Sequence, residues 1–274
     1  MAIMLALVCQ LFSSAALAQK DQLISSRLDP IRFQLRWHHQ FQFAGYYAAK
    51  EKGFYEQAGF DVTLVAGSPH VEPVEEVLAG RAQYGEGNSE VLYSRLLGDP
   101  LVAMAVIFQH SPSVLLTLTS SGIETPKDLI NKRVMSVGGE GDAVFLAMLS
   151  KQDVAIDEVE LTDSSYQIED LINGKTDAFN SYVTNEPFFL ESQGVPYNVI
   201  APRDYGVDFY SDILFTTEQE ANNNPERVRR FKEATLLGWK YALANPEEII
   251  QIIREKYNNK KTLNHMRFEA LSIQ

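Results

Sequence analysis

Short runs rich in Val, Ile, Leu and aromatic residues alternate with longer stretches in which apolar residues recur every three or four positions. The short runs are typical of β-strands, and the longer stretches are typical of amphipathic helices. In the first part of the chain the pattern predicts strands at 31–37, 61–65, 82–85 and 101–108, and helices at 44–52, 72–78 and 89–97. Alternating strands and helices form parallel sheets covered by helices, so we expect an α/β fold with parallel-rich sheets.

The same alternation begins again after a strand predicted at 113–119. It predicts further strands at 133–137, 158–161, 178–182 and 197–201, and helices at 143–151, 167–173 and 186–192. A strand at 211–217 then leads into helices at 225–243 and 246–257, each of which begins with an Asn-Pro pair typical of helix starts. We therefore place a first lobe at 29–115, a second lobe at 116–208 and a return to the first lobe at 209–274.

Two α/β lobes joined by more than one crossing segment enclose a cleft. A ligand held there contacts strand ends and helix starts from both sides, and the lobes close by bending at the crossing segments. The last stretch, 264–273, reads as the start of another helix. We expect the first lobe to be incomplete and the C-terminus to be truncated in this chain.

The composition narrows the class of partner. The 274 residues include 24 Lys and Arg against 36 Asp and Glu, which gives a formal charge of −12, and 45% of the residues are hydrophobic. That hydrophobic share suits a globular protein with a sizeable core. The surplus of negative charge repels phosphates, so we expect neither a nucleic-acid partner nor an anionic membrane surface.

The first 18 residues read as a secretory signal peptide. They carry no charged side chain, and their apolar run is followed by small residues that end in Ala16-Leu17-Ala18, a pattern typical of a signal-peptidase site. No Lys or Arg precedes the apolar run, and the alternative is an N-terminal helix buried in the fold. Cleavage after Ala18 would remove Cys9, the single cysteine, and would exclude disulfides and thiolate metal sites. We therefore expect a periplasmic protein.

The loop after the first predicted strand carries the most informative residues. It contains Trp37, His39 and Gln40, and Tyr46 stands in the first turn of the helix predicted at 44–52. Loops at the carboxyl ends of parallel strands face the cleft, where aromatic faces stack a planar ligand and amides bind its edge. The alternative is that the aromatic residues pack the loop onto its lobe. The pair His38-His39 could suggest a metal, but adjacent histidines do not converge easily on one ion.

Two glycine-containing turns lie at matching places in the two predicted lobes. The ligand-binding candidates in these turns are Asn88, Ser89, Gly138, Gly139, Glu140 and Gly141. Free backbone N–H groups at such turns favour an anion or a carbonyl oxygen. Neither turn has the spacing of a Walker loop or a dinucleotide fingerprint. Each alone could be a structural turn, and the matching positions are what favour binding.

A third group of candidates follows a predicted strand of the second lobe. Tyr182, Asn185 and Glu186 stand where this strand leads into a helix. Glu186 would either complement the positive end of that helix or reach into the cleft and accept hydrogen bonds from an amine or a ring N–H. We also include Phe108, which ends a predicted strand, and Asp208, which precedes the returning strand.

Motifs for catalysis are absent from the sequence. No G-x-S-x-G, H-E-x-x-H or EF-hand pattern occurs. The sequence also contains no nucleophile, base and orienting group at a spacing typical of a catalytic site. We therefore expect a protein that is not an enzyme and that holds no cofactor and no metal.

Five segments carry a familiar combination of motifs. They are 37–60, 80–85, 123–128, 177–178 together with 185–187, and 224–228. Together they resemble the periplasmic solute-binding proteins that bind thiamine pyrimidine precursors, alkanesulfonates and nitrate. The resemblance is strongest for the branch shared with the yeast-type pyrimidine synthase of thiamine biosynthesis. It covers nearly all of 31–274 and implies a two-lobe, type II periplasmic binding protein fold with a central ligand cleft.

Carried over residue by residue, the resemblance implies a set of ligand contacts. They are Trp37, Gln40, Tyr46, Asn88, Ser89, the turn at 138–141, Tyr182 and Glu186. The synthase pattern departs from this sequence, because it needs a lysine that holds pyridoxal phosphate and a histidine four residues later, and the nearest matches are Gly87 and Val91. Its cysteine-rich motif, expected near 209–213, is also absent. The resemblance therefore favours binding over synthesis.

Residues and resemblance together predict an extracytoplasmic solute-binding protein. It would capture a small planar molecule, similar to a thiamine pyrimidine precursor, by hinge closure and deliver it to an ABC permease, acting as a monomer. The segments 182–186 and 205–208 also resemble the extracytoplasmic input domains of bacterial histidine kinases and diguanylate cyclases, so a ligand-sensing input domain is the alternative. A pyrimidine-synthase-like enzyme is the disfavoured alternative.

Overall fold

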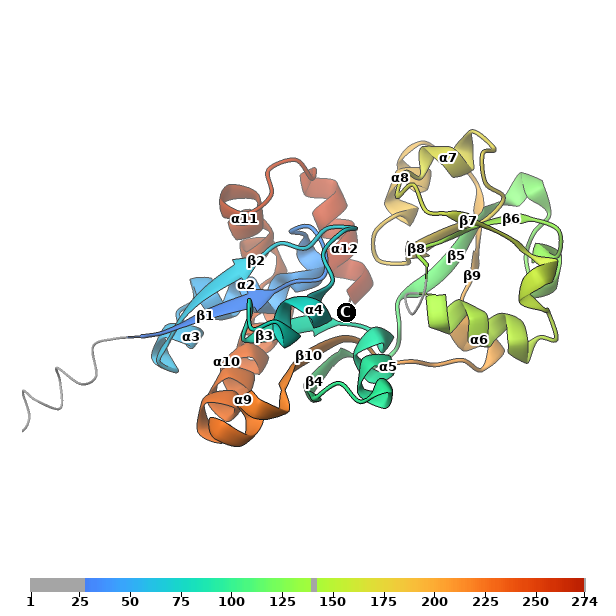
Figure 1. The fold of residues 1–274 in the computed structure, drawn as a ribbon. Coiled ribbons are helices and arrows are strands. Elements are labelled where there is room, and N and C mark those ends of the chain that lie inside the picture. The colour runs from blue at the N-terminus through green and yellow to red at the C-terminus, as the bar shows by residue number, and fades with distance from the viewer. Residues whose placement is uncertain (1–27, 139–141, 274) are drawn as a thin grey trace, which may run out of the picture.

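The computed structural model describes residues 28–138 and 142–273, which form two α/β lobes side by side (Figure 1). The predicted signal peptide and the predicted site residues Gly139, Glu140 and Gly141 lie outside the described residues. The colours of Figure 1 show that the chain builds most of one lobe, crosses to the second and returns to complete the first. Within the described ranges, no helix is both long enough and apolar enough to cross a membrane.

A five-stranded mixed sheet forms the centre of the first lobe, with the order β2-β1-β3-β10-β4. The strands are β1 Asp29–Gln34, β2 Phe60–Val65, β3 Tyr84–Gly87, β4 Leu101–Phe108 and β10 Ser211–Thr217. β1 runs parallel to β2 and β3, whereas β10 is antiparallel to both β3 and β4. Because β10 inserts between two early strands, the C-terminal part of the chain belongs to the first lobe.

The helices of the first lobe pack against this sheet and against one another. They are α2 Ala44–Glu51, α3 Phe54–Gln57, α4 Pro73–Leu78, α5 Ser89–Leu97, α9 Glu218–Asn223, α10 Pro225–Ala244, α11 Pro246–Lys256 and α12 Leu263–Ile273, with a 3-10 helix at Phe41–Phe43. The contact of α2 with α10 depends on small residues. A Cβ atom at Gly238 would lie 2.2 Å from the backbone oxygen of Gly45, so a larger residue there would force the two helices apart.

Aromatic stacking fills the core of the first lobe. Phe231 of α10 stacks on Tyr84 with ring centroids 4.0 Å apart and on Tyr55 with centroids 4.9 Å apart, and all three rings are buried. Phe33 of β1 meets the ring of Phe231 edge-on. This cluster fixes the long helix α10 against the sheet, because offset-stacked and edge-on pairs are the favoured arrangements of aromatic rings.

The second lobe contains two small sheets. A three-stranded sheet has the order β8-β5-β9, and β6 pairs with β7. The strands are β5 Ser113–Leu118, β6 Arg133–Ser136, β7 Glu160–Asp163, β8 Phe179–Tyr182 and β9 Tyr197–Ile200, and the helices are α6 Ala143–Lys151, α7 Glu169–Ile172 and α8 Pro187–Ser192. β5 is antiparallel to β8 and β9, so the sheet of the second lobe already starts at Ser113, three residues before the expected boundary.

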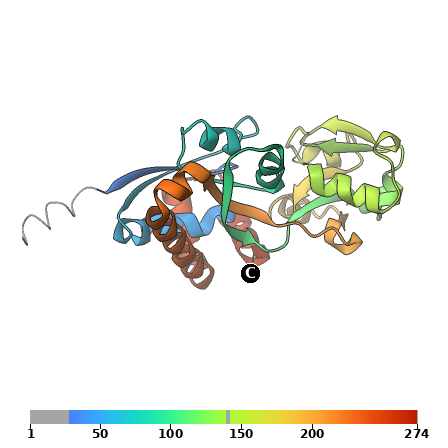
Figure 2. The same ribbon diagram turned by 60° about the horizontal axis from the view of Figure 1, so that its bottom comes forward.

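Two extended segments cross between the lobes. One joins β4 to β5 and the other leads into β10, and Figure 2 shows both running from one lobe to the other. His110 Nδ1 of the first segment lies 2.8 Å from Asp208 Oδ2 of the second. The predicted two-lobe architecture with more than one crossing segment is therefore present.

Most predicted helices and strands occur within a few residues of the expected bounds. Two short helices, α3 and α9, were not predicted. α3 has only four residues and begins directly after Gly53, which adopts a left-handed conformation with φ 76°. α9 reads EQEANN and has no apolar residue except one alanine, so it lacks the periodicity that indicates a helix.

Candidate functional site

A cleft with a volume of about 850 Å³ lies between the two lobes. The first lobe contributes the loop after β1, the loop before α4, the start of α5 and the loop between α11 and α12. The second lobe contributes the turn after β6, the start of α7, and the segment from β8 into α8. The volume falls in the range of about 300–1,000 Å³ that is usual for small-molecule sites.

An aromatic pair joins the two sides of the cleft. Trp37 follows β1 in the first lobe, and Tyr166 precedes α7 in the second. Their ring centroids are 5.1 Å apart with an interplanar angle of 45°, and the ring of His38 lies 5.3 Å from that of Trp37. Because contacting rings are normally 4.5–7 Å apart, Trp37 and Tyr166 touch directly. A planar ligand would therefore lie against this pair rather than between its two rings.

Glu186 presents a carboxylate whose orientation is fixed by its own lobe. Its Oε2 accepts hydrogen bonds from Ser181 Oγ and from the backbone N of Tyr182, each at 2.9 Å. Its Oε1 accepts from Asn185 Nδ2. Three donors hold this carboxylate at the cleft wall, which leaves its remaining acceptor capacity for a donor on a ligand.

Arg36 and Tyr182 connect the two lobes at the cleft. Arg36 Nη1 donates to the hydroxyl of Tyr182 at 3.0 Å, and Asn88 Nδ2 donates to the same hydroxyl at 2.7 Å. Ser211 Oγ donates to Asn88 Oδ1 at 2.7 Å, which extends the network to β10. Burial raises the pKa of the Tyr182 phenol, so it stays a neutral hydrogen-bonding group.

Two buried carboxyl groups lie close to Arg36. Glu86 and Asp212 are 0% and 1% exposed. Glu86 Oε2 accepts from the backbone N of Arg36 at 3.3 Å, and Asp212 Oδ2 accepts from Gln42 Nε2 at 2.9 Å. Burial raises the pKa of Glu86 well above its usual value and that of Asp212 to about 6, and the positive charge of Arg36 opposes both shifts. Burial therefore disfavours two negative charges in this pair, and the negative charge that the pair does carry lies close to Arg36.

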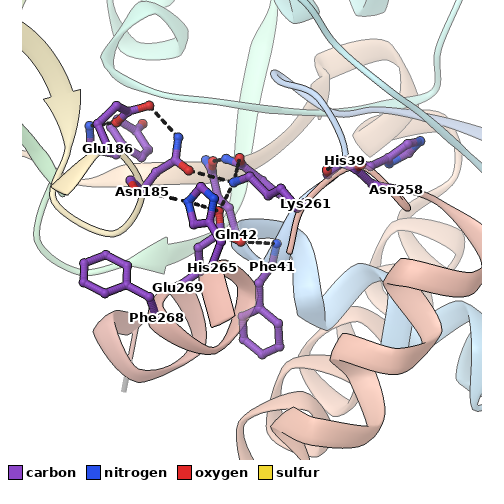
Figure 3. Close-up of polar contacts among 12 residues, drawn as sticks. His39, Phe41, Gln42, Asn185, Glu186, Asn258, Lys261, His265, Phe268 and Glu269 are labelled. Carbon is purple, nitrogen blue, oxygen red and sulfur yellow. Dashed lines mark hydrogen bonds and ion pairs between the residues drawn. The ribbon is translucent and has the colours of Figure 1, made fainter. Parts of the chain in front are cut away.

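Lys261 is a second cation that already has partners. Its Nζ donates to Gln40 Oε1 at 2.7 Å and to Asn185 Oδ1 at 2.6 Å, and it forms an ion pair with Glu269 (Figure 3). An ammonium group has three donors. Lys261 is therefore saturated by protein acceptors, although it lines the cleft.

Two polar atoms at the cleft have no hydrogen-bond partner among the described residues. They are Nε of Arg36, a donor, and Oδ1 of Asn180, an acceptor. Both residues line the cleft. Buried polar groups are nearly always hydrogen-bonded, so an unpaired donor and acceptor at a cleft wall favour a ligand or water that supplies the missing partners.

Eight of the sequence-predicted site residues line the cleft. They are Trp37, His39, Gln40, Asn88, Gly138, Tyr182, Asn185 and Glu186. These residues come from four strand-to-helix segments that are far apart in the sequence, and the two-lobe fold brings them together. Their contact with a ligand stays a prediction.

Four predicted site residues do not line the cleft. Tyr46 is fully buried in the core of the first lobe, where it packs edge-on against Phe33. Ser89 begins α5 but is not among the residues that line the cleft, and Phe108 packs against Trp239 instead. Asp208 pairs with His110 between the crossing segments. These expectations of a cleft position are corrected by the structure.

Several cleft residues were missed by the sequence analysis. They include Arg36, Tyr166, Asn180, Phe189 and Lys261. Arg36 stands directly before Trp37, and a cation next to an aromatic candidate could have been noted. Lys261 and Tyr166 lie in loops without a motif, and only the folded chain brings them to the cleft.

The pyridoxal phosphate chemistry of the synthase branch does not fit these residues. Gly87, the nearest match to the required lysine, has no side chain, and a Cβ atom there would lie 2.8 Å from Glu90 Oε1 and from Val91 Cγ2. A longer side chain would need both neighbours to move. Over 28–138 and 142–273, no group of three or more His, Cys, Asp or Glu side chains could hold a metal ion.

Two α/β lobes that enclose a central cleft define the periplasmic binding protein fold. The periplasmic aliphatic sulphonate binding protein SsuA of Escherichia coli has the same fold, with a TM-score of 0.70 and 15% identity over 90% of this chain and 84% of that chain. The chain belongs to the NMT1/THI5 like family, whose model matches residues 40–249.

Similar sequences are named both as binding proteins and as synthases. The formylaminopyrimidine-binding protein of Halalkalibacterium halodurans is 22% identical over 90% of this chain and 77% of that protein. The riboflavin-binding protein RibY of Chloroflexus aurantiacus is 26% identical over 82% of this chain and 66% of that protein. A 4-amino-5-hydroxymethyl-2-methylpyrimidine phosphate synthase of Legionella pneumophila is 23% identical over 84% of this chain and 74% of that protein.

Proposed function

We propose that this protein is a periplasmic solute-binding component that captures a small amino-substituted heteroaromatic molecule between its two lobes and delivers it to an ABC permease. The observation that carries the proposal is the cleft itself, in which Trp37 and the fixed carboxylate of Glu186 face the same cavity from opposite lobes. The ring of the ligand stacks on Trp37, and its amino group donates to Glu186. The names of the two binding-protein relatives, a pyrimidine binder and a flavin binder, support a planar heteroaromatic ligand.

The charges at the cleft favour a neutral or cationic ligand over an anion. The described lining contains four carboxylates, Glu72, Glu90, Glu169 and Glu186, against three cations, Arg36, Lys260 and Lys261. Arg36 is balanced by the buried carboxyl pair behind it, and Lys261 by Glu269. An alkanesulfonate would add a negative charge to a lining that already has more carboxylates than cations, so we expect sulfonates to bind weakly.

A role in binding rather than catalysis is supported by the same residues. The described cleft residues offer a stacking surface, a fixed acceptor and several amides, and Ser181, whose hydroxyl donates to Glu186, is one of the groups that fix this acceptor. The position nearest to the synthase lysine is Gly87, where a side chain would require Glu90 and Val91 to move. The protein therefore releases its ligand unchanged.

A calorimetric comparison of four ligands tests the proposal. The ligands are formylaminopyrimidine, 4-amino-5-hydroxymethyl-2-methylpyrimidine, riboflavin and an alkanesulfonate such as MOPS. We expect at least one of the two aminopyrimidines to bind with a negative heat-capacity change, because binding buries apolar ring surface, and MOPS to bind at least tenfold more weakly. Tight binding of MOPS, with no heat from either pyrimidine, would contradict the proposal.

A further inference from the structure

The last helix of the first lobe makes a buried contact with the second lobe. The ring of His265 in α12 stacks on Phe188 of α8, with centroids 4.4 Å apart and planes 8° apart, and it meets the edge of Phe189 at 4.7 Å. Phe268 lies 5.8 Å from Phe188. His265 is only 3% exposed. This contact is separate from the crossing segments and from the Trp37 pair at the cleft.

Lys261 supplies a polar part of the same contact. It precedes α12 and is anchored in the first lobe by Glu269, which is 2% exposed and also accepts from the backbone N of Phe41 at 2.9 Å. From this anchor, Lys261 Nζ donates to Asn185 Oδ1 of the second lobe at 2.6 Å. An ammonium fixed by a buried carboxylate cannot follow the second lobe when the lobes separate, so opening breaks its bond to Asn185.

Asn185 lies between this contact and the cleft carboxylate (Figure 3). Its Oδ1 accepts from Lys261, and its backbone oxygen accepts from His265 Nε2 at 3.2 Å. Its Nδ2 donates to Oε1 of Glu186. Because the amide group is planar, holding Nδ2 on Glu186 also directs Oδ1 towards Lys261. One side chain therefore links the candidate ligand acceptor to the contact between the lobes.

We infer that Asn185, Phe188, Lys261 and His265 form a closure lock that stabilises the closed arrangement of the lobes, and that Asn185 couples this lock to Glu186. The inference rests on the proposed capture of a ligand by hinge closure. The carboxylate of Glu186 holds Asn185 Nδ2, and Asn185 thereby presents its oxygen to Lys261. A ligand that donates to Glu186 and also contacts Trp37 meets both lobes together only when they are closed. Binding in the cleft thereby favours closure through a differential contact with the two states.

The ratio of open to closed molecules, measured without ligand, tests the lock. Spin labels on cysteines at positions Glu56 and Asp157, one exposed site on each lobe, report the interlobe distance by double electron–electron resonance in a Cys9→Ser background. We expect Lys261→Met to raise the open-to-closed ratio roughly five- to thirty-fold, the change produced by losing one or two contacts. Lys240→Met, on an exposed position of α10, is the matched control and should leave the ratio unchanged.

Lys261→Met leaves the buried carboxylate of Glu269 without its ion-pair partner. A second variant therefore keeps the test decisive if Lys261→Met folds poorly. Phe188→Ala removes the ring under His265 from a half-buried position and should shift the ratio in the same direction. An unchanged ratio in Phe188→Ala, or in a folded Lys261→Met, overturns the lock and identifies the contact as a fixed pivot around which the lobes turn.

A double-mutant cycle tests the coupling through Asn185. Glu186→Ala removes the acceptor of Asn185 Nδ2, so the effect of Lys261→Met on the open-to-closed ratio should shrink in that background. If the double variant changes the open-to-closed ratio by the product of the two single changes, the coupling through Asn185 is refuted. The cycle is measured without ligand, so failure of aminopyrimidines to bind would contradict the proposed function but leave this result interpretable.

Discussion

The substitution Glu186→Gln removes the charge of the proposed ligand acceptor at almost constant volume. One carboxylate oxygen becomes an NH₂ group, which cannot accept a hydrogen bond from a ligand amine or from Asn185 Nδ2. The other oxygen can still accept from Ser181 Oγ and the backbone N of Tyr182, which lie 2.9 Å from Oε2 in the native protein, so the local fold should persist. A hydrogen bond to a charged group contributes about 1.5–3 kcal/mol. The dissociation constant for an aminopyrimidine should therefore rise roughly 10- to 150-fold.

Isothermal titration calorimetry with 4-amino-5-hydroxymethyl-2-methylpyrimidine and with formylaminopyrimidine measures this change. Glu191→Gln is the matched control, because Glu191 lies on α8, the helix that directly follows Glu186, but accepts from the hydroxyl of Tyr197 outside the cleft. The control should bind as the native protein does. If Glu186→Gln and Glu191→Gln both keep native affinity while the native protein binds the pyrimidine, Glu186 is not the acceptor and the reasoning fails.

Three further predictions follow from single positions. Trp37→Ala removes the stacking surface and should weaken aminopyrimidine binding by about 1–3 kcal/mol, measured by the same titration; native affinity would exclude stacking on Trp37. His265 is held neutral in the folded protein, because burial and then the charge of Lys261 lower its pKa from 6.5 to about 3. Between those two pH values the unfolded chain binds more protons than the folded protein, so the free energy of unfolding should fall as the pH drops from about 6.5 towards 3. The contribution of His265 to this fall is up to about 1.4 kcal/mol per pH unit. In urea titrations at several pH values, His265→Gln should therefore show a weaker dependence of stability on pH. Gly238→Ala places a Cβ atom 2.2 Å from the backbone oxygen of Gly45 and should lower the free energy of unfolding by about 1–3 kcal/mol in the same assay. An unchanged free energy of unfolding would mean that α2 and α10 can move apart without destabilising the fold.

The helices and strands were largely predictable because their signals are local. The apolar period, the Asn-Pro helix starts and the glycines that end helices act within a few residues. The strand-to-helix loops carrying Trp37 and Asn88 were predictable for the same reason, since loops at the carboxyl ends of parallel strands gather at one edge of a sheet. Glu186 was predictable as a residue between a strand and a helix, although its strand β8 is antiparallel to β5. Eight of the candidate residues consequently line the cleft.

The remaining site residues depend on packing that no local pattern encodes. Tyr46 was expected at the cleft because it is aromatic and near the loop, but α2 is covered on one side by the sheet and on another by α10, so its ring is buried. Lys261 is separated from Asn185 by 76 positions, and only the return of the chain to the first lobe brings them together. Similarly, Tyr166 reaches Trp37 across the gap between the lobes.

A crystal structure of the protein grown with formylaminopyrimidine tests the central claim most directly. Capture between the lobes predicts density for one pyrimidine ring in the cleft, stacked on Trp37, with an amino nitrogen within hydrogen-bond distance of the Glu186 carboxylate. Density for the ligand at any other place, or a cleft that contains only solvent at saturating ligand, would contradict it.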